Sequence, residues 1–278
     1  VSSMSRHVSR NLLVGVATLA IAGSALSQPA AAQSFLGTPT VTTGGATVST
    51  SPNNTTVDIN ASLTVINWQP DDTTGTGTIA FQPVGTTALF RGGNFQDFTV
   101  LNRILPVDIN GAPVFSRPIR FDGTVNSQVG FSATTTAGSI WFYTPGGIIL
   151  GSSSAFNVGS LVLSTSDIDQ TNMFVGNSGT INFTGTPNTS SAITLENGAQ
   201  VNALIGGSSY LAMVAPRIVQ NGTIQVDGSA ALVGAEVADI TMGGPGGLFD
   251  ITVSTGTGDA TGVVHGELGT TTGTASGG

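Results

Sequence analysis

The sequence has no cysteine, no lysine and only two histidines, and each absence narrows the range of functions. Without cysteine the chain can form neither a disulfide nor a thiolate metal site, and it has no cysteine nucleophile. Charged residues make up only 8% of the 278 residues, against about 25% in an ordinary soluble domain. The net charge of −8 argues against nucleic-acid binding, which needs a basic surface that releases counterions from phosphate.

The abundant residues indicate an all-β protein. A hydrophobic content of 39% is too high for a disordered segment, and residues that favour helices, such as Leu, Glu and Lys, are scarce or absent. Glycine (39 residues), threonine, serine, valine, isoleucine and asparagine take their place. Because β-branched residues favour strands while glycine and asparagine favour turns, we expect many short strands between tight turns.

The segment 1–32 has the pattern of a secretory signal peptide. Arg6 and Arg10 form a basic start, residues 12–22 are mostly apolar, and three alanines at 30–32 supply a small-residue cleavage site. The apolar run is shorter than the roughly 18–20 residues needed to cross a bilayer, and no later run has that length, so we predict no stable membrane span. We therefore expect an exported protein at the cell surface or outside the cell, associated with the outer membrane.

The mature chain divides into three parts by its pattern. Residues 33–56 are Thr/Ser/Gly-rich and predict an N-terminal arm or cap, and residues 251–278 predict a Gly/Thr-rich tail at the start of a longer passenger. Between them, residues 57–250 carry the predicted strands, which follow one another every 6–9 residues between residues 192 and 241. The clearest runs lie at 62–68, 78–82, 139–143, 160–164, 192–196, 199–204, 210–215, 223–226, 230–234 and 237–241.

A recurring unit favours a solenoid over a sandwich of hairpins. Gly-Thr-(Ile/Val) occurs at 77–79, 123–125, 179–181 and 222–224, with separations near multiples of about 20 residues, a typical solenoid period. That length suits one coil of a parallel β-helix, in which each strand pairs with its equivalents in the coils on either side. A sandwich would also give many short strands, but few connecting segments are long enough for its crossovers.

Three stretches resemble the secretion domain of filamentous-haemagglutinin-type exoproteins, the cargo of two-partner secretion. They are NRI at 102–104 followed by FDGTV at 121–125; SIWFYTPGGIILG at 139–151 followed by FNVGSLVLST at 156–165; and GGSSYLAMVAPRIVQNGTIQVDG, which includes Gly207–Val219. Together they span roughly residues 57–241. The family's Asn-Pro-Asn-Gly-Ile reads Thr144-Pro145-Gly146-Gly147-Ile148 here, so both asparagines are lost, although Gly146 retains the freedom to take a positive φ.

The resemblance implies a fold, a partner and a route. The fold is a right-handed parallel β-helix, a single-stranded solenoid like that of pectate lyases, with an N-terminal cap. The partner is an outer-membrane β-barrel transporter of the two-partner type, through which the chain crosses unfolded. The function is then that of a secretion domain of an adhesin-like exoprotein with a host-cell or surface ligand. Asn102, Arg103, Pro145 and Gly147 are the residues that we expect to face the transporter or to define turns.

Arginine is scarce, so each arginine of the mature chain is a candidate for a specific role. Arg103 either has a specific role, as a contact to the transporter or a bridge to a carboxylate, or is an ordinary exposed arginine with its stem on apolar surface. The residues alone do not decide between these alternatives. For Arg217 we expect a structural role.

The sequence gives little support for catalysis or for cofactor binding. His7 leaves with the signal peptide, and His265 lies in the predicted tail without a nucleophile motif, so no catalytic triad is indicated. There is no metal-ligand motif and no phosphate loop, so we predict no cofactor, no metal and no enzyme activity. Asp71 and Asp72 are expected in a turn. Asp167 and Asp169 could share a strand face, but we expect Asp167 to follow the preceding strand at a turn.

The sequence leaves two alternative functions open. A β-helical polysaccharide-active enzyme would use Asp167 and Asp169, a pair that could also bind Ca²⁺. A fragment of a contact-dependent growth inhibition toxin would be recognised by sequence that follows residue 278.

Overall fold

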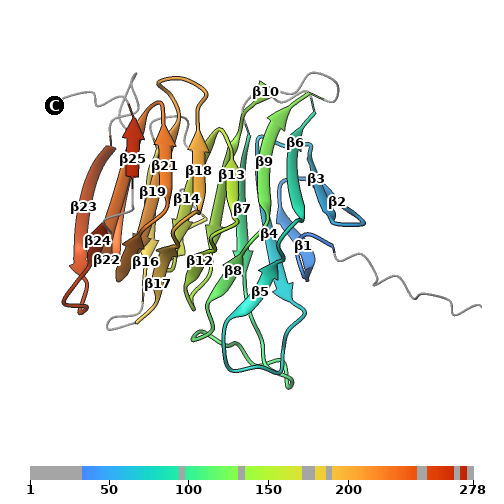
Figure 1. Cartoon of the computed structure of the whole chain (residues 1–278), viewed down its shortest axis with the longest axis horizontal. Coiled ribbons are helices and arrows are strands. Elements are labelled where there is room, and N and C mark those ends of the chain that lie inside the picture. Colours follow the sequence, from blue (N-terminus) through green and yellow to red (C-terminus); the bar gives the residue numbers. More distant parts are fainter. Residues whose placement is uncertain are drawn as a thin grey trace, which may run out of the picture. The chain divides into compact units, whose positions relative to one another are not determined.

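The computed structural model describes residues 33–93, 98–130, 135–170, 179–185, 190–242, 249–265 and 270–273. Three sheets built from successive coils of the chain form the fold, and the strands of neighbouring coils lie side by side (Figure 1). The predicted signal peptide, with Arg6, His7 and Arg10, lies outside the described residues. No helix in the described part of the chain has the length and apolar character needed to cross a membrane.

Each sheet takes one strand from every coil. Sheet 1 contains β1 (Gly37–Thr43), β4 (Leu63–Pro70), β7 (Thr99–Ile104), β11 (Ser139–Tyr143), β14 (Ser160–Ser164), β19 (Tyr210–Ala215) and β22 (Ser229–Met242). Sheet 2 contains β2 (Ala46–Ser51), β3 (Asn54–Ile59), β6 (Thr87–Gly92), β9 (Thr124–Val129), β13 (Ala155–Asn157), β18 (Gln200–Ala203), β21 (Thr223–Val226) and β25 (Thr270–Gly273). Sheet 3 contains β5 (Ile79–Gln82), β8 (Ile119–Phe121), β12 (Ile148–Leu150), β17 (Ala192–Leu195), β20 (Arg217–Gln220) and β24 (Val263–His265).

From β3 onward the chain visits sheets 2, 1 and 3 in turn, and each strand pairs in parallel with its equivalents in the adjoining coils. This is the predicted right-handed parallel β-helix, which the structure confirms; right-handed connections are the strong preference between parallel strands. The coils are not of equal length, because Leu63 pairs with Thr99 across a long coil, whereas Leu211 pairs with Ala230 across a much shorter one. Insertions between the strands therefore hide the regular period expected from the sequence.

The two ends of the helix differ from the sequence-based boundaries. Antiparallel strands begin the fold, because β1 pairs with β4 and β2 with β3. The side chain of Phe35 is fully buried against Trp68 and Phe81 beneath this N-terminal end. Parallel pairing begins at Asn54, shortly before the expected start at residue 57. At the other end, β24 and β25 continue sheets 3 and 2 beyond residue 250, so the coil extends into what the sequence assigned to a tail.

Sheet 1 is buried on both faces, unlike the other two sheets. Its inner face contributes Ile66, Phe142 and Leu163 to the core inside the coil. Its outer face carries a row of apolar residues in register, Val65, Leu101, Trp141, Val162, Ala212 and Ala231. Strands buried on both faces read as continuous apolar runs, which is why β11, β14 and β19 stand out in the sequence.

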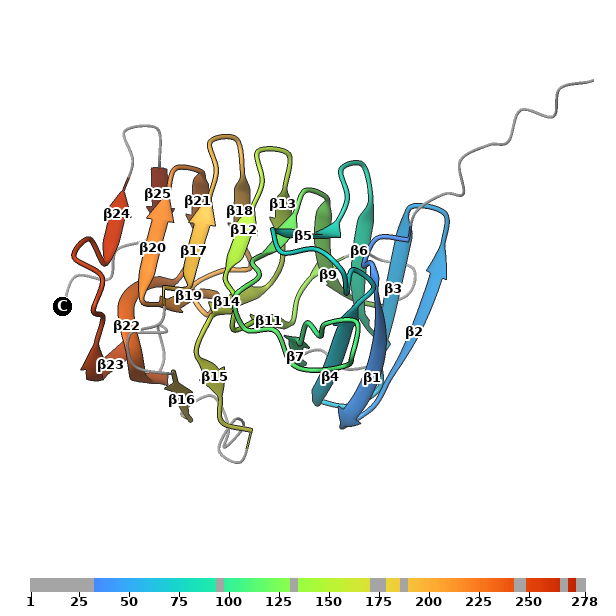
Figure 2. The same cartoon turned by 90° about the horizontal axis from the view of Figure 1, so that it is seen from below.

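An insertion after β14 covers the outer row of sheet 1. It contains β15 (Asp167–Ile168) and β16 (Thr180–Thr184), and β16 pairs antiparallel with the second half of β22. Figure 2 shows both strands on the outer side of sheet 1. On the far edge of β22 lies β23 (Phe249–Gly256), and β10 (Thr135–Thr136) extends sheet 2 beside β9. The Gly-Thr-Ile unit at 179–181 begins β16, so it does not mark a coil.

Small residues stack at the corner between sheets 3 and 2. Each N–H there donates to the coil before it: Thr124 to Thr86, Ala155 to Gly123, Gln200 to Ser154 and Thr223 to Ala199. A Cβ on Gly123 would lie 2.6 Å from the Thr86 carbonyl oxygen, and one on Gly222 would lie 2.7 Å from that of Ala199. This close backbone approach explains the glycine in two of the four Gly-Thr-(Ile/Val) units.

Candidate functional site

Asn102 lies inside the coil rather than on its surface. It occupies the middle of β7, in register with Ile66 of β4 and Phe142 of β11, and its side chain is fully buried. Its Oδ1 accepts a 3.0 Å hydrogen bond from Nε1 of Trp68, and its Nδ2 donates to the carbonyl of Trp141 at 3.2 Å. In the folded domain Asn102 is therefore not at the surface, and its amide is bonded to a buried indole.

Arg103 points to the opposite face of the same strand. Its Nη2 forms a 2.6 Å ion pair with Oδ2 of Asp167, and its guanidinium carbon lies 5.4 Å from the ring centroid of Tyr143. Of the two roles considered for Arg103, the bridge to a carboxylate is present in the structure. The same bond engages one of the two acids proposed as a catalytic or Ca²⁺-binding pair.

The structure contains no assembled metal site at those acids. Asp167 also accepts a hydrogen bond from the backbone N–H of Ile168, while the backbone N–H of Asp169 bonds to the carbonyl of Asn182. Within the described ranges there is no group of three His, Asp or Glu residues that could hold a metal ion. Burial raises the pKa of the Tyr143 hydroxyl to about 12; the charge of Asp167 acts in the same direction and that of Arg103 opposes it.

Pro145 and Gly147 form the corner between sheets 1 and 3. Pro145 and Gly146 lie in the turn that follows β11, and Gly147 precedes β12 with a φ of 117°. The positive φ thus falls on Gly147, one residue later than expected. Gly146 is needed for space instead, because a Cβ there would lie 2.1 Å from the carbonyl oxygen of Arg117.

The corner is bonded to the coils on either side of it. Gly147 accepts a 2.8 Å hydrogen bond from the N–H of Ile119, and the hydroxyl of Ser191 donates to the carbonyl of Pro145. A Cβ on Gly147 would lie 2.9 Å from the carbonyl oxygen of Ala192. Pro145 and Gly147 therefore lie at a corner whose backbone is bonded to the coils on either side.

The first two of the three resembling stretches meet in the folded chain. Arg103 of the first motif pairs in register with Tyr143 of the second, and Thr144 and Pro145 follow directly. The candidate residues therefore come from neighbouring coils, although they are far apart in sequence. Asn102 and Arg103 lie on opposite faces of β7, so they do not form one surface.

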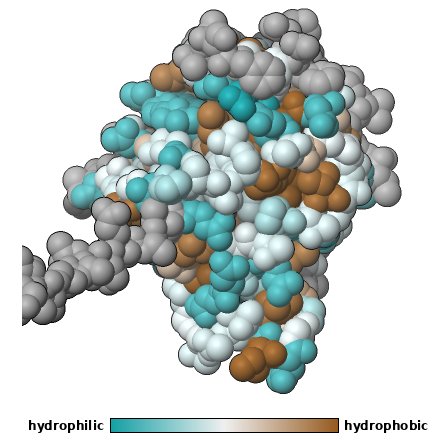
Figure 3. All heavy atoms as spheres, turned by 90° about the vertical axis from the view of Figure 1, so that its right-hand side faces the viewer, coloured by the Kyte–Doolittle hydropathy of each residue, from teal (hydrophilic) through white to brown (hydrophobic). Residues whose placement is uncertain are grey.

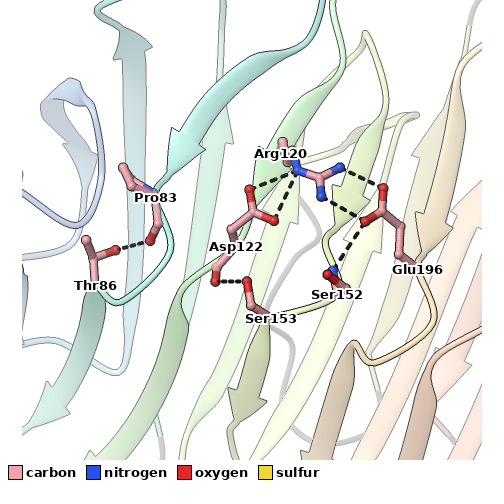
Figure 4. Close-up of polar contacts among 7 residues, drawn as sticks. All are labelled: Pro83, Thr86, Arg120, Asp122, Ser152, Ser153 and Glu196. Carbon is pink, nitrogen blue, oxygen red and sulfur yellow. Dashed lines mark hydrogen bonds and ion pairs between the residues drawn. The ribbon is translucent and has the colours of Figure 1, made fainter.

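Sequence reasoning missed a network of charges on the outer face of sheet 3. Arg120 of β8 donates through Nε to Asp122 and through Nη1 and Nη2 to Glu196, at distances of 2.7–3.1 Å (Figure 4). The backbone N–H of Ser152 adds a 3.2 Å bond to Glu196. These contacts raise the pKa of the Arg120 guanidinium, chiefly through its hydrogen bond with Glu196, and lower the pKa of Glu196.

A glycine makes room for this network. A Cβ on Gly151 would lie 1.9 Å from Oδ1 of Asp122 and 2.6 Å from Nη2 of Arg120. The network links β8, the turn after β12 and the end of β17, and so fixes the register of three coils. In the same view, the hydroxyls of Thr86 and Ser153 donate to the carbonyls of Pro83 and Asp122 (Figure 4).

Arg117 is the second residue that the sequence did not reveal. Its side chain is only 4% exposed, and it forms a 2.5 Å ion pair with Asp72 and a 2.8 Å hydrogen bond from Nε to the carbonyl of Gly77. The Arg117 hydrogen bond, with backbone N–H groups of the turn, lowers the pKa of Asp72. The turn expected at Asp71 and Asp72 is present, and the loop after β7 is tied to it.

The remaining single residues do not add to the site. Arg217 is exposed and belongs to none of the ion pairs found among the described residues, so the structure does not support the structural role expected for it. Its charge lowers the pKa of Asp259, to a lesser degree than the hydrogen bonds of Thr261 do. His265 lies in β24, in register with Gln220, and not in a tail.

These features define a class of fold: a capped parallel β-helix whose motif residues form ion pairs and turns. A solved structure has the same fold, that of the HMW1 secretion domain from Haemophilus influenzae, with 17% sequence identity and a TM-score of 0.51. The match covers 82% of this chain and 51% of that chain, so it spans about half of the solved domain. No family model and no curated protein matches the sequence.

Proposed function

We propose that this chain is the N-terminal secretion domain of an adhesin-like exoprotein that an outer-membrane β-barrel transporter of the two-partner type recognises. The observation that carries the proposal is the shared fold with a secretion domain, at a TM-score of 0.51. The ordered motifs support it, since they fall on adjoining coils and supply the corner and the ion pair described above. In this proposal the domain has no catalytic role.

The absence of cysteine fits this route. A chain that crosses the outer membrane unfolded must not be cross-linked in the periplasm, where disulfides form readily. A parallel β-helix depends on contacts between distant parts of the chain, which slows folding and leaves time for export. Folding outside the cell then opposes return through the transporter.

Recognition in this scheme precedes folding. Asn102 is fully buried once the coil has formed, so the transporter would read it, with Arg103, Pro145 and Gly147, in the unfolded chain. The folded structure then reuses the same residues for its interior, an ion pair and a corner.

The proposal is tested by secretion of tagged residues 1–278 from bacteria with and without the transporter gene. We expect the chain in the medium or on the surface only when the transporter is present. Arg103→Ala and Pro145→Ala should reduce the amount outside the cell. Arg91→Ala is the matched control, because Arg91 forms a similar 2.6 Å ion pair with Asp58 but lies outside the resembling motifs.

The result distinguishes recognition from stability. Arg91→Ala and Arg103→Ala each remove an ion pair between partly exposed side chains, and Arg103→Ala also removes the contact with the ring of Tyr143. Urea unfolding of both purified variants gives the loss of stability against which each secretion level is compared. Equal secretion of the two variants would contradict a recognition role for Arg103, and equal secretion with and without the transporter would contradict the proposed function.

A further inference from the structure

The loop between β7 and β8, residues 105–118, is a rigid protrusion. Oδ1 of Asp108 accepts 2.8 Å hydrogen bonds from the N–H groups of Asn110 and Ala112, and Val107 bridges to Pro113. The ion pair between the buried side chain of Arg117 and the partly exposed Asp72, described above, fixes the base of the loop. The loop is therefore held in one conformation by a rigid scaffold, an arrangement that often carries a binding function.

This loop exposes two large apolar side chains. Ile109 is 75% exposed and Phe115 is 63% exposed. Figure 3 shows apolar residues at the lower end of the molecule, where the loops after β4 and β7 lie in Figure 1. Burial of a phenylalanine is favourable, so a ligand that covers the exposed ring of Phe115 would gain free energy from that contact.

Phe115 forms one wall of a cleft on the outer face of sheet 3. The cleft has a volume of about 520 Å³, within the range of small-molecule sites. Gly146 and Ile149 line it next to the loop, and Ser191 and Thr194 line it from the following coil. None of the described residues that line it carries a charge. Gly146 leaves this part of the cleft without a side chain.

We propose that this cleft binds a neutral oligosaccharide. The apolar face of a pyranose ring stacks on an exposed aromatic ring, here Phe115, while hydroxyl groups at the opposite wall, such as that of Thr194, can exchange hydrogen bonds with the sugar. An anionic sugar would find no cation in the lining, and the neighbouring Arg120 is already paired with Asp122 and Glu196. The net charge of −8 would also repel it. A peptide strand would find no free edge, because β12 is paired on both sides, with β8 and with β17.

This proposal concerns the folded domain and holds whatever the export route. Its test is calorimetric titration of the purified, folded protein with hexasaccharides of glucose, mannose, galactose and N-acetylglucosamine, and with hexagalacturonate as the anionic comparison. We expect at least one neutral hexasaccharide to bind, and hexagalacturonate to bind at least about tenfold more weakly, because the cleft offers it no counter-charge.

Two variants and a control locate the site. Phe115→Ala should weaken binding of the neutral sugar about tenfold, which corresponds to the stabilisation from one aromatic contact. Thr194→Val should weaken it severalfold. Ile109→Ala changes another exposed apolar residue of the same loop, one that does not line the cleft, and should leave binding unchanged. The proposal is overturned if none of the four neutral sugars binds, or if Phe115→Ala and Ile109→Ala have the same effect.

Discussion

Arg103 and Tyr143 lie opposite each other on adjoining strands, with the guanidinium carbon 5.4 Å from the centre of the phenol ring. Asp167, from the insertion that covers sheet 1, completes the cluster through its 2.6 Å bond to Arg103. The cluster thereby joins two coils to the outer insertion. Arg103 belongs to the first resembling stretch and Tyr143 to the second, and Asp167 follows shortly after the second.

The tyrosine of this cluster makes stability depend on pH in the alkaline range. The pKa of Tyr143 is raised from 10.0 to about 12 because the ring is buried. The unfolded chain therefore loses its proton first, and the free energy of unfolding should fall between pH 10 and pH 12, by at most about 1.4 kcal/mol per pH unit. Below pH 10 this contribution is constant. Urea unfolding of the protein and of Tyr143→Phe tests the effect: the variant should lose part of this slope, and equal slopes would contradict the assignment.

The buried bond between Trp68 and Asn102 should show strong coupling. Asn102→Leu leaves the indole N–H of Trp68 buried without its acceptor, which we expect to cost about 1–3 kcal/mol in the free energy of unfolding. The same substitution should cost clearly less in a Trp68→Phe background, where no N–H is left unpaired. A double-mutant cycle in denaturant measures the difference, and additive effects would show that the bond contributes nothing.

The corner at Pro145 and Gly147 should not tolerate even a methyl group. Gly146→Ala places a Cβ 2.1 Å from the carbonyl oxygen of Arg117, so backbone must move, at a cost of about 1–3 kcal/mol. Gly207→Ala is the control, since a Cβ there meets nothing within 4 Å, and it should change stability by less than about 0.5 kcal/mol. Thermal unfolding of both variants gives the comparison, and similar midpoints would mean that the corner can relax.

Sequence patterns located the strands that are buried on both faces. The runs at 139–143, 160–164 and 210–215 coincide with β11, β14 and β19, since continuous burial leaves an unbroken apolar signal. Residues 37–51 gave no such signal, because β1 and β2 are mostly exposed. The coil length was obscured by the insertions at 105–118 and 165–191, so the regular spacing of the Gly-Thr-(Ile/Val) units was only partly informative.

The side-chain contacts of the site were harder to predict from the sequence than its turns. Glycine and proline mark the corner at 145–147 directly, because their backbone preferences are local. Arg120 and Glu196, in contrast, are 76 residues apart, and no local pattern pairs them. Similarly, only the fold shows that Asn102 faces the interior while Arg103 faces outward.

The network around Arg120 should protect the fold against acid. Its hydrogen bond lowers the pKa of Glu196 below the ordinary value of 4.5. The stabilisation is therefore complete above the pKa of the unfolded chain and is lost as the pH falls through the lower folded value. Glu196→Gln should lower the unfolding temperature at pH 7, and the difference from the unaltered protein should shrink as the pH falls below 4.5. A constant difference down to pH 2.5 would contradict this role.

The central claim is that a dedicated transporter exports this domain, and protease treatment of intact cells tests it most directly. Tagged residues 1–278 are produced in cells with and without the transporter, and added protease digests only what is outside. The account predicts digestion of the chain, or its release into the medium, in cells with the transporter, and full protection in cells without it. Protection in both strains, or exposure in both, would contradict the claim.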